Sequence, residues 1–237
     1  MFTINFSLKY FLIFFLGISF FVSLGFWQIK RGHEKKDLIL RYQEEQTKPL
    51  KLWNVNLPKP LQYQRLKVKG HYAKSVIFLD NQYYQHKWGY HVLSPFFLAR
   101  NTVVMVDRGW VNGGSSRSYV PYVNTPTQEI TLVGNAYTPL RSNVFLRNTL
   151  EKKQAFVWVI AQFDTKMLQN ILHQNVLPFI IRLNREEPYG YVRDWQIVTM
   201  QKERHYAYAF QWFSLALLLL VLGVICFFKG QSHAVNK

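Results

Sequence analysis

The chain is poor in cysteine and in acidic residues. Cys226 is the one cysteine among 237 residues, which excludes an intramolecular disulfide and any CxxC or paired Cys/His metal site. Thirteen Asp and Glu stand against 29 Lys and Arg, and the formal net charge is +16. Only 18% of the residues are charged, whereas 17% are aromatic. This balance is typical of membrane proteins, whose Trp and Tyr collect at the lipid–water boundary.

The common catalytic signatures are also missing. The chain has no G-x-S-x-G, no GxxxxGK[ST], no GxGxxG after a strand and no HExxH. Asp80 and Asp107 are the candidates for a carboxylate pair. Asp80 lies at the end of a predicted strand and Asp107 directly precedes Arg108, and such an Asp ordinarily binds a turn or a neighbouring Arg such as Arg108. We therefore interpret both as structural residues and expect that the protein is not an enzyme.

The surplus of basic residues indicates an anionic partner. These residues are scattered along the chain and do not gather on one helix or stripe, which argues against nucleic acid. Anionic lipid head groups or an acidic ligand fit the pattern better.

Two long uncharged runs lie near the ends of the chain. Residues 10–27 form the first, and as a helix they span about 27 Å, close to the thickness of a bilayer core. A cleavable signal peptide is the alternative, but it needs a shorter run, a basic start and an A-x-A-like site. Residues 207–228 form the second run, which is too long and too free of charge for a buried core helix.

These runs divide the chain. We predict transmembrane helices over 10–28 and 205–228, short tails at 1–9 and 229–237, and a domain over 29–204. Two spans place both termini on the same side of the membrane. Lys and Arg are more numerous beside the inner ends of the spans than in the tails, so the positive-inside rule places the middle domain in the cytoplasm.

The middle of the chain has the pattern of a β domain. Strands are predicted at 64–71, 76–79, 90–97, 103–111, 129–137, 156–160 and 179–183. Turn signals at Asp80-Asn81, Gly113-Gly114 and Thr125-Pro126 separate them, and 47–60 is interpreted as a connector. A helix is predicted over 164–174 with Asp164 as its N-cap. The predicted fold class is an α+β membrane protein: two transmembrane helices flank a mainly antiparallel β-rich domain with one or two helices.

His205 is the most informative of the seven histidines, because it immediately precedes the second apolar run. There it meets hydrocarbon on one side and water on the other, and a neutral imidazole can ligate haem iron. The aromatic belt of Tyr206, Tyr208 and Trp212 could receive the porphyrin face, and Lys202 and Arg204 could pair with the propionates. An ordinary interfacial histidine is the alternative, and position alone favours it. His33, six residues beyond Trp27, is expected near the same membrane face, which allows a bis-histidine arrangement.

Five stretches of the chain carry a family resemblance. In order they are LGFWQIKRGHEKKDLI (24–39), DNQYYQHKWGYHVLSPF (80–96), VVMVDRGWV (103–111), LPFIIRLNREEPYGYVRDWQ (177–196) and RHYAYAFQWFSLA (204–216). The chain resembles, from end to end, the Surfeit locus protein 1 family of cytochrome c oxidase assembly factors. The last stretch is similar to that family's HxxYAxQWFxLA entry to its second helix.

The resemblance implies an outer location for the middle domain, the periplasm in bacteria. This contradicts the local charge count, but long domains are translocated largely regardless of charge. Because the chain begins directly at the first span without a transit peptide, we expect a bacterial inner-membrane protein. The resemblance also implies that the protein holds haem a and aids its insertion into the oxidase catalytic subunit. His205 is the position linked to haem a, and Trp212 lies in the same motif.

Three departures from the family pattern stand out. No proline precedes His205, Gln82 replaces an Arg, and His33 falls at a position that the family leaves free. The expected partners are the catalytic subunit of the oxidase, the lipid bilayer and, as a haem donor, the haem a synthase. A chaperone that grips the catalytic subunit without haem is one alternative, and a membrane enzyme acting on haem or quinone is another. The oxidase served could take electrons from cytochrome c or from quinol.

Overall fold

The computed structural model describes residues 8–118, 120–139 and 149–235, with side chains described from Tyr10 to Phe228 within these ranges. The chain divides into two compact units. One combines Met1–Arg41 with Gln196–Lys237, and the other is Tyr42–Trp195.

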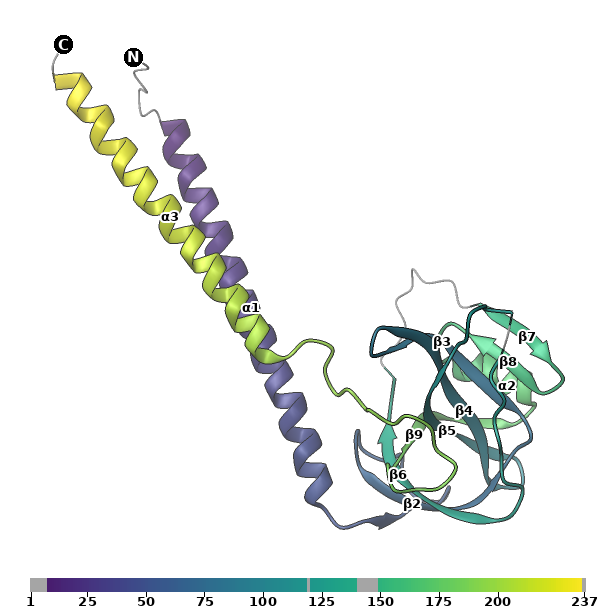
Figure 1. Ribbon diagram of the computed structural model, residues 1–237. Coiled ribbons are helices and arrows are strands. Elements are labelled where there is room, and N and C mark those ends of the chain that lie inside the picture. The colour runs from purple at the N-terminus through teal and green to yellow at the C-terminus, as the bar shows by residue number, and fades with distance from the viewer. Residues whose placement is uncertain (1–7, 119, 140–148, 236–237) are drawn as a thin grey trace. The chain divides into compact units, whose positions relative to one another are not determined.

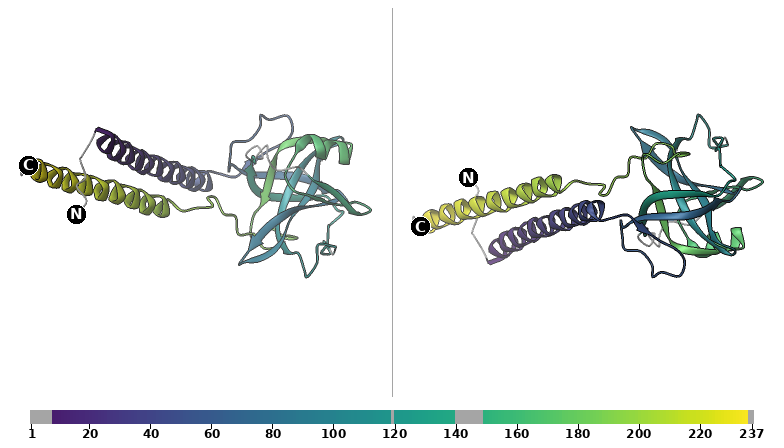
Figure 2. Two further views of the ribbon diagram at one scale, coloured as in Figure 1. Left: turned by 90° about the horizontal axis from the view of Figure 1, so that it is seen from above. Right: turned by 90° about the horizontal axis from the view of Figure 1, so that it is seen from below.

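Two long helices dominate the first unit: α1 (Leu8–Thr47), which belongs to it as far as Arg41, and α3 (Lys202–Val235). In both views of Figure 2 they lie side by side. Each contains a stretch long and apolar enough to cross a membrane. With 40 residues, α1 is about 60 Å long, roughly twice the thickness of a bilayer core. It continues past its apolar run and ends at Thr47, because Pro49 disfavours helical backbone at Lys48.

The second unit is built on β strands (Figure 1). In the described ranges these are β1 (Lys51–Leu52), β2 (Arg65–Tyr72), β3 (Val76–Tyr84), β4 (Lys87–Ala99), β5 (Thr102–Asn112), β6 (Ile130–Tyr137), β7 (Leu150–Gln154), β8 (Val157–Ile160) and β9 (Asn175–Leu183). They form one sheet in the order β1-β2-β6-β9-β5-β4-β3-β8-β7. Together with the two apolar helices, this sheet confirms the predicted α+β membrane protein.

The sheet closes into a barrel because β4 pairs with two strands along the same edge. Its first half pairs with β3, and farther on Phe96 and Phe97 pair with β2. The strands β2, β6, β9, β5 and β4 therefore form a closed ring. Gly70 of β2 is required at this crossing, because a Cβ atom there would lie 1.9 Å from the carbonyl oxygen of Phe97.

The strand β5 is buried on both faces and separates two cores. Val104 and Val106 point into the barrel, whereas Val103 and Met105 pack in the cluster that α2 (Thr165–Leu172) covers. The N-cap of α2 is Asp164, as predicted, and its side chain accepts a hydrogen bond from the backbone N–H of Met167.

The seven predicted strands are confirmed, with ends that shift by up to five residues, but the predicted turn at Asp80-Asn81 is wrong. These residues lie within β3, where the register with β4 shifts and Asn81 takes a φ of +58°. A bulge of this kind keeps the strand pairing on both sides. The chain reverses instead at Gln85 and His86, which have φ values of 48° and 63°.

Candidate functional site

The helices α1 and α3 pack closely because glycines of α1 face bulky side chains of α3. The pairs are Gly17 with Leu219, Gly25 with Phe213, and Gly32 with Tyr206. A Cβ atom at Gly25 would lie 2.5 Å from the Phe213 ring. On α3, Ala209 and Ala216 are buried. Small residues at such positions let two helix backbones approach, as in membrane-embedded helix pairs.

His205 lies inside this helix pair, with only 9% of its surface exposed. Its Nδ1 is 2.8 Å from the side-chain Oε1 of Gln28 on α1. An amide oxygen only accepts hydrogen bonds, so Nδ1 carries the proton and donates it. The other ring nitrogen, Nε2, is buried and has no hydrogen-bond partner among the described residues. The imidazole is therefore held as the tautomer with an unused lone pair on Nε2.

The aromatic residues after His205 take different positions. Tyr206 contacts His33 edge-on, at 5.9 Å between ring centroids. Trp212 stacks on Phe21 of α1, at 5.7 Å. Tyr208 is 43% exposed, so its side chain remains available on the outside of the helix pair. The belt predicted from the sequence is thus partly used in joining α1 to α3.

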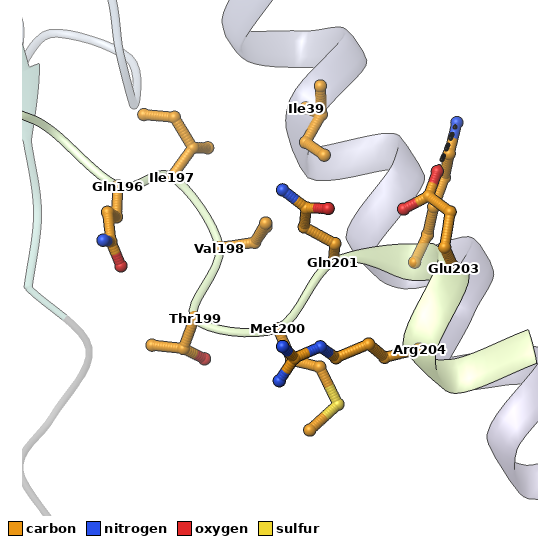
Figure 3. A pocket seen from close by; sticks show the side chains of 10 residues that line it. Ile39, Gln196, Ile197, Val198, Thr199, Met200, Gln201, Glu203 and Arg204 are labelled. Carbon is orange, nitrogen blue, oxygen red and sulfur yellow. Dashed lines mark ion pairs between the residues drawn. The ribbon is translucent and has the colours of Figure 1, made fainter. Parts of the chain in front are cut away.

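The first turn of α3 borders a cleft of about 730 Å³. Its lining residues are Ile39 of α1, the loop 196–201 and the first turn, Lys202, Glu203 and Arg204 (Figure 3). Lys202 is paired with Glu203 at 3.7 Å. Arg204 is exposed, and no ion pair of its guanidinium is seen within the described residues. The cleft joins basic and apolar groups, and its size lies in the usual range for small-molecule pockets. His205 is not one of its lining residues.

Asp80 and Asp107 do not form a carboxylate pair. Asp80 binds Arg117, as well as the indole N–H of Trp88. Asp107 accepts a hydrogen bond from Nδ1 of His91 at 2.9 Å. Both Asp residues are structural, as interpreted from the sequence: Asp80 binds an Arg, and Asp107 also accepts a hydrogen bond from the backbone N–H of Gly109. The Arg is Arg117 and not Arg108, and the sequence analysis did not select His91 as a partner of Asp107.

Arg108 is completely buried in the β domain, where its side chain connects separate segments of the chain by hydrogen bonds. Its guanidinium donates to the carbonyl oxygens of Tyr189 and Asn124, and to the hydroxyls of Ser94 and Thr125. Burial lowers the pKa of this guanidinium from its usual value, although Arg remains charged at neutral pH. No carboxylate contacts it among the described residues. The hydrogen bonds tie two long connecting segments to β5.

The class of protein is defined by these features: two helices able to cross a membrane, a closed β barrel formed by the part of the chain that connects them, and a histidine buried inside the helix pair. The SURF1 family matches the chain over residues 15–217. A SURF1-like protein of Rickettsia prowazekii is 28% identical over 242 residues, covering 91% of this chain and 88% of the relative. One from Rickettsia conorii is 25% identical over 244 residues, covering 94% and 92%.

The chain belongs to the SURF1 family, a family of oxidase assembly factors. Its two apolar helices and its family fit an inner-membrane protein.

Proposed function

We propose that this protein binds haem a through His205 and aids its insertion into the catalytic subunit of cytochrome c oxidase. The observation that carries the proposal is the state of the imidazole: Nδ1 is held by Gln28 and Nε2 has a free lone pair. Metal-ligating histidines usually donate their other ring N–H to an oxygen acceptor in this way. A buried polar atom without a partner costs about 1–3 kcal/mol, which a ligand would recover.

The residues around His205 suit a haem. When bound, haem a supplies an iron atom that accepts an axial imidazole. Lys202 and Arg204 line the neighbouring cleft, and in this proposal they would pair with the propionates. Tyr208 offers an exposed ring one turn from His205, and Trp212 lies one turn farther on the same side of α3. Tyr206 and His33 contact each other at the same end of the helix pair. His33 is an open candidate for a second ligand.

The burial of Nε2 sets a condition on this function. Because Nε2 is covered, no ligand reaches that nitrogen until the side chains over it open, while Nδ1 keeps its hydrogen bond to Gln28. The free energy spent on opening reduces the net affinity. A moderate affinity suits a carrier that must release its cargo. The proposal includes a non-enzymatic role, a middle domain in the periplasm, and the haem a synthase as the donor.

The experiment is a visible absorption spectrum of the chain purified from membranes of cells that also make haem a. We expect a low-spin haem a spectrum in the unchanged chain and none in His205→Gln, whose side chain can still donate to Gln28. His71→Ala is the matched control, because His71 is exposed on β2, and it should retain the spectrum. If His33 is the second ligand, His33→Ala should change the spectrum to high-spin, and an unchanged spectrum would remove it.

One observation favours a second candidate, a chaperone of the catalytic subunit that binds no haem. The hydrogen bond between His205 and Gln28 joins the two helices and could serve pairing alone. This candidate predicts a colourless protein whose His205→Gln variant still supports oxidase assembly. Haem in the unchanged chain, lost together with assembly in the variant, would refute it.

A further inference from the structure

Gln28 is a polar side chain at the boundary of an apolar helix, one residue after Trp27. It is half-buried, and its Oε1 lies 2.8 Å from Nδ1 of His205, 177 residues away along the chain. No other hydrogen bond of either side chain is seen within the described part of the chain. The contact is therefore specific to this pair.

We propose that Gln28 is a positioning residue, which fixes the tautomer and the direction of the His205 imidazole for iron ligation. This inference rests on the proposed haem function and adds a residue to it. A free histidine side chain prefers the proton on Nε2, the nitrogen that an axial ligand must offer without a proton. An acceptor at Nδ1 reverses that preference, and it also raises the basicity of the ligating nitrogen.

The geometry separates this role from simple helix pairing. Helix pairing is supplied all along α1 and α3 by ring contacts and glycine contacts, including Phe26 with Phe213 at 5.4 Å and Phe21 with Trp212 at 5.7 Å. None of these contacts touches the His205 ring. The contact to Gln28 is the one that determines which nitrogen carries the proton.

Gln28→Met tests the role, because Met has a similar length and no strong acceptor. The matched control is Phe26→Leu, which weakens the packing on Phe213 without contacting His205. In the haem-free full chain in detergent micelles, ¹⁵N chemical shifts of His205 report the tautomer. We expect the Nδ1–H form in the unchanged chain and in Phe26→Leu, and a shift toward the Nε2–H form in Gln28→Met.

The second readout is haem affinity. Removing the hydrogen-bond acceptor of a metal-ligating histidine typically weakens metal binding about 10- to 100-fold. We expect haem affinity to fall by this factor in Gln28→Met and to stay unchanged in Phe26→Leu. Gln28→Glu keeps an acceptor and adds negative charge, so it should retain haem and lower its midpoint potential.

The failures of the two proposals differ. An Nε2–H tautomer in the unchanged chain, or the same tautomer in Gln28→Met, overturns the positioning role whether or not haem binds. A changed tautomer with unchanged haem affinity also overturns it and leaves the haem function standing. Absence of haem from the unchanged chain, with the Nδ1–H tautomer present, overturns the haem function and the positioning role with it.

Discussion

Replacing Arg108 should destabilise the β domain more than most single substitutions would. In Arg108→Met, the carbonyl oxygens of Asn124 and Tyr189 lose their charged donor inside the protein. Each unsatisfied buried acceptor costs about 1–3 kcal/mol. Removing a buried charge that has no carboxylate partner returns part of this cost. We expect a net loss of about 3 kcal/mol in the free energy of unfolding.

The assay is denaturant unfolding of the purified chain in detergent, followed by tryptophan fluorescence. The free energy of unfolding of Arg108→Lys should fall by about 2 kcal/mol, because a single ammonium group cannot bind all four acceptors that the planar guanidinium binds. Limited proteolysis gives a second readout, since the segments carrying Asn124 and Tyr189 are held by this side chain. If the free energy of unfolding of Arg108→Met falls by less than about 1 kcal/mol and its proteolysis is unchanged, Arg108 does not hold these segments in place.

Two further predictions concern Tyr72 and Gly25. Burial raises the pKa of the Tyr72 hydroxyl above its ordinary value of 10.0, and this hydroxyl has no partner among the described residues. The unfolded chain therefore loses this proton first as the pH rises above 10, so the folded state loses stability there, by up to about 1.4 kcal/mol per pH unit. Tyr72→Phe removes this unpaired hydroxyl, so it should be more stable than the unchanged chain at pH 7, by about 1–3 kcal/mol at most, and it should lose less stability between pH 10 and 11 in the same unfolding assay. Gly25→Ala should displace the Phe213 ring and destabilise the packing of α1 on α3 by about 1–3 kcal/mol. The population of the open helix pair should then rise at least roughly fivefold. Diethyl pyrocarbonate should then modify His205 faster than in Gly223→Ala, where the added Cβ lies 3.3 Å from its nearest neighbour, and equal rates would contradict this.

The strands were predictable where burial alternates or is continuous. The pattern of β2, with Leu66 and Val68 inward and Lys67 and Lys69 outward, is legible in the sequence. The sequence of β7, LEKKQ, is not, because this strand lies at the edge of the sheet, is mostly exposed, and is held by its pairing with β8. Such a strand depends on its neighbour and carries no hydrophobic period of its own.

The turns show a different limit. Asp80-Asn81 has the composition of a turn, yet it forms a bulge inside β3. The reversal at Gln85-His86 lacks the Asn and Gly that usually mark a tight hairpin. Pairing along β4 overrides local preference at both places.

The candidate site was predictable in part. The position of His205 beside the second apolar run selected it together with its aromatic neighbours, the resemblance added support for His205 and Trp212, and their roles stay predictions. The burial of His205 and its contact with Gln28 depend on how two helices pair, and no local pattern encodes a contact across 177 residues. The polar Gln28 just beyond Trp27 was the available signal.

The strand order also constrains when the domain can fold. The last strand along the chain, β9, lies between β5 and β6 in the middle of the barrel. The ring of strands cannot close until the chain has been synthesised through residue 183, the end of β9. Only 18 residues lie between this point and the start of α3, so the barrel closes late in synthesis. The edge of the apolar strand β5 that pairs with β9 stays unpaired while the more than sixty residues between the two strands are synthesised. Barrels with such late, long-range pairing fold slowly and expose aggregation-prone surface meanwhile. This domain should therefore depend on a holding chaperone while it is being synthesised, and β5 is the segment that such a chaperone would protect.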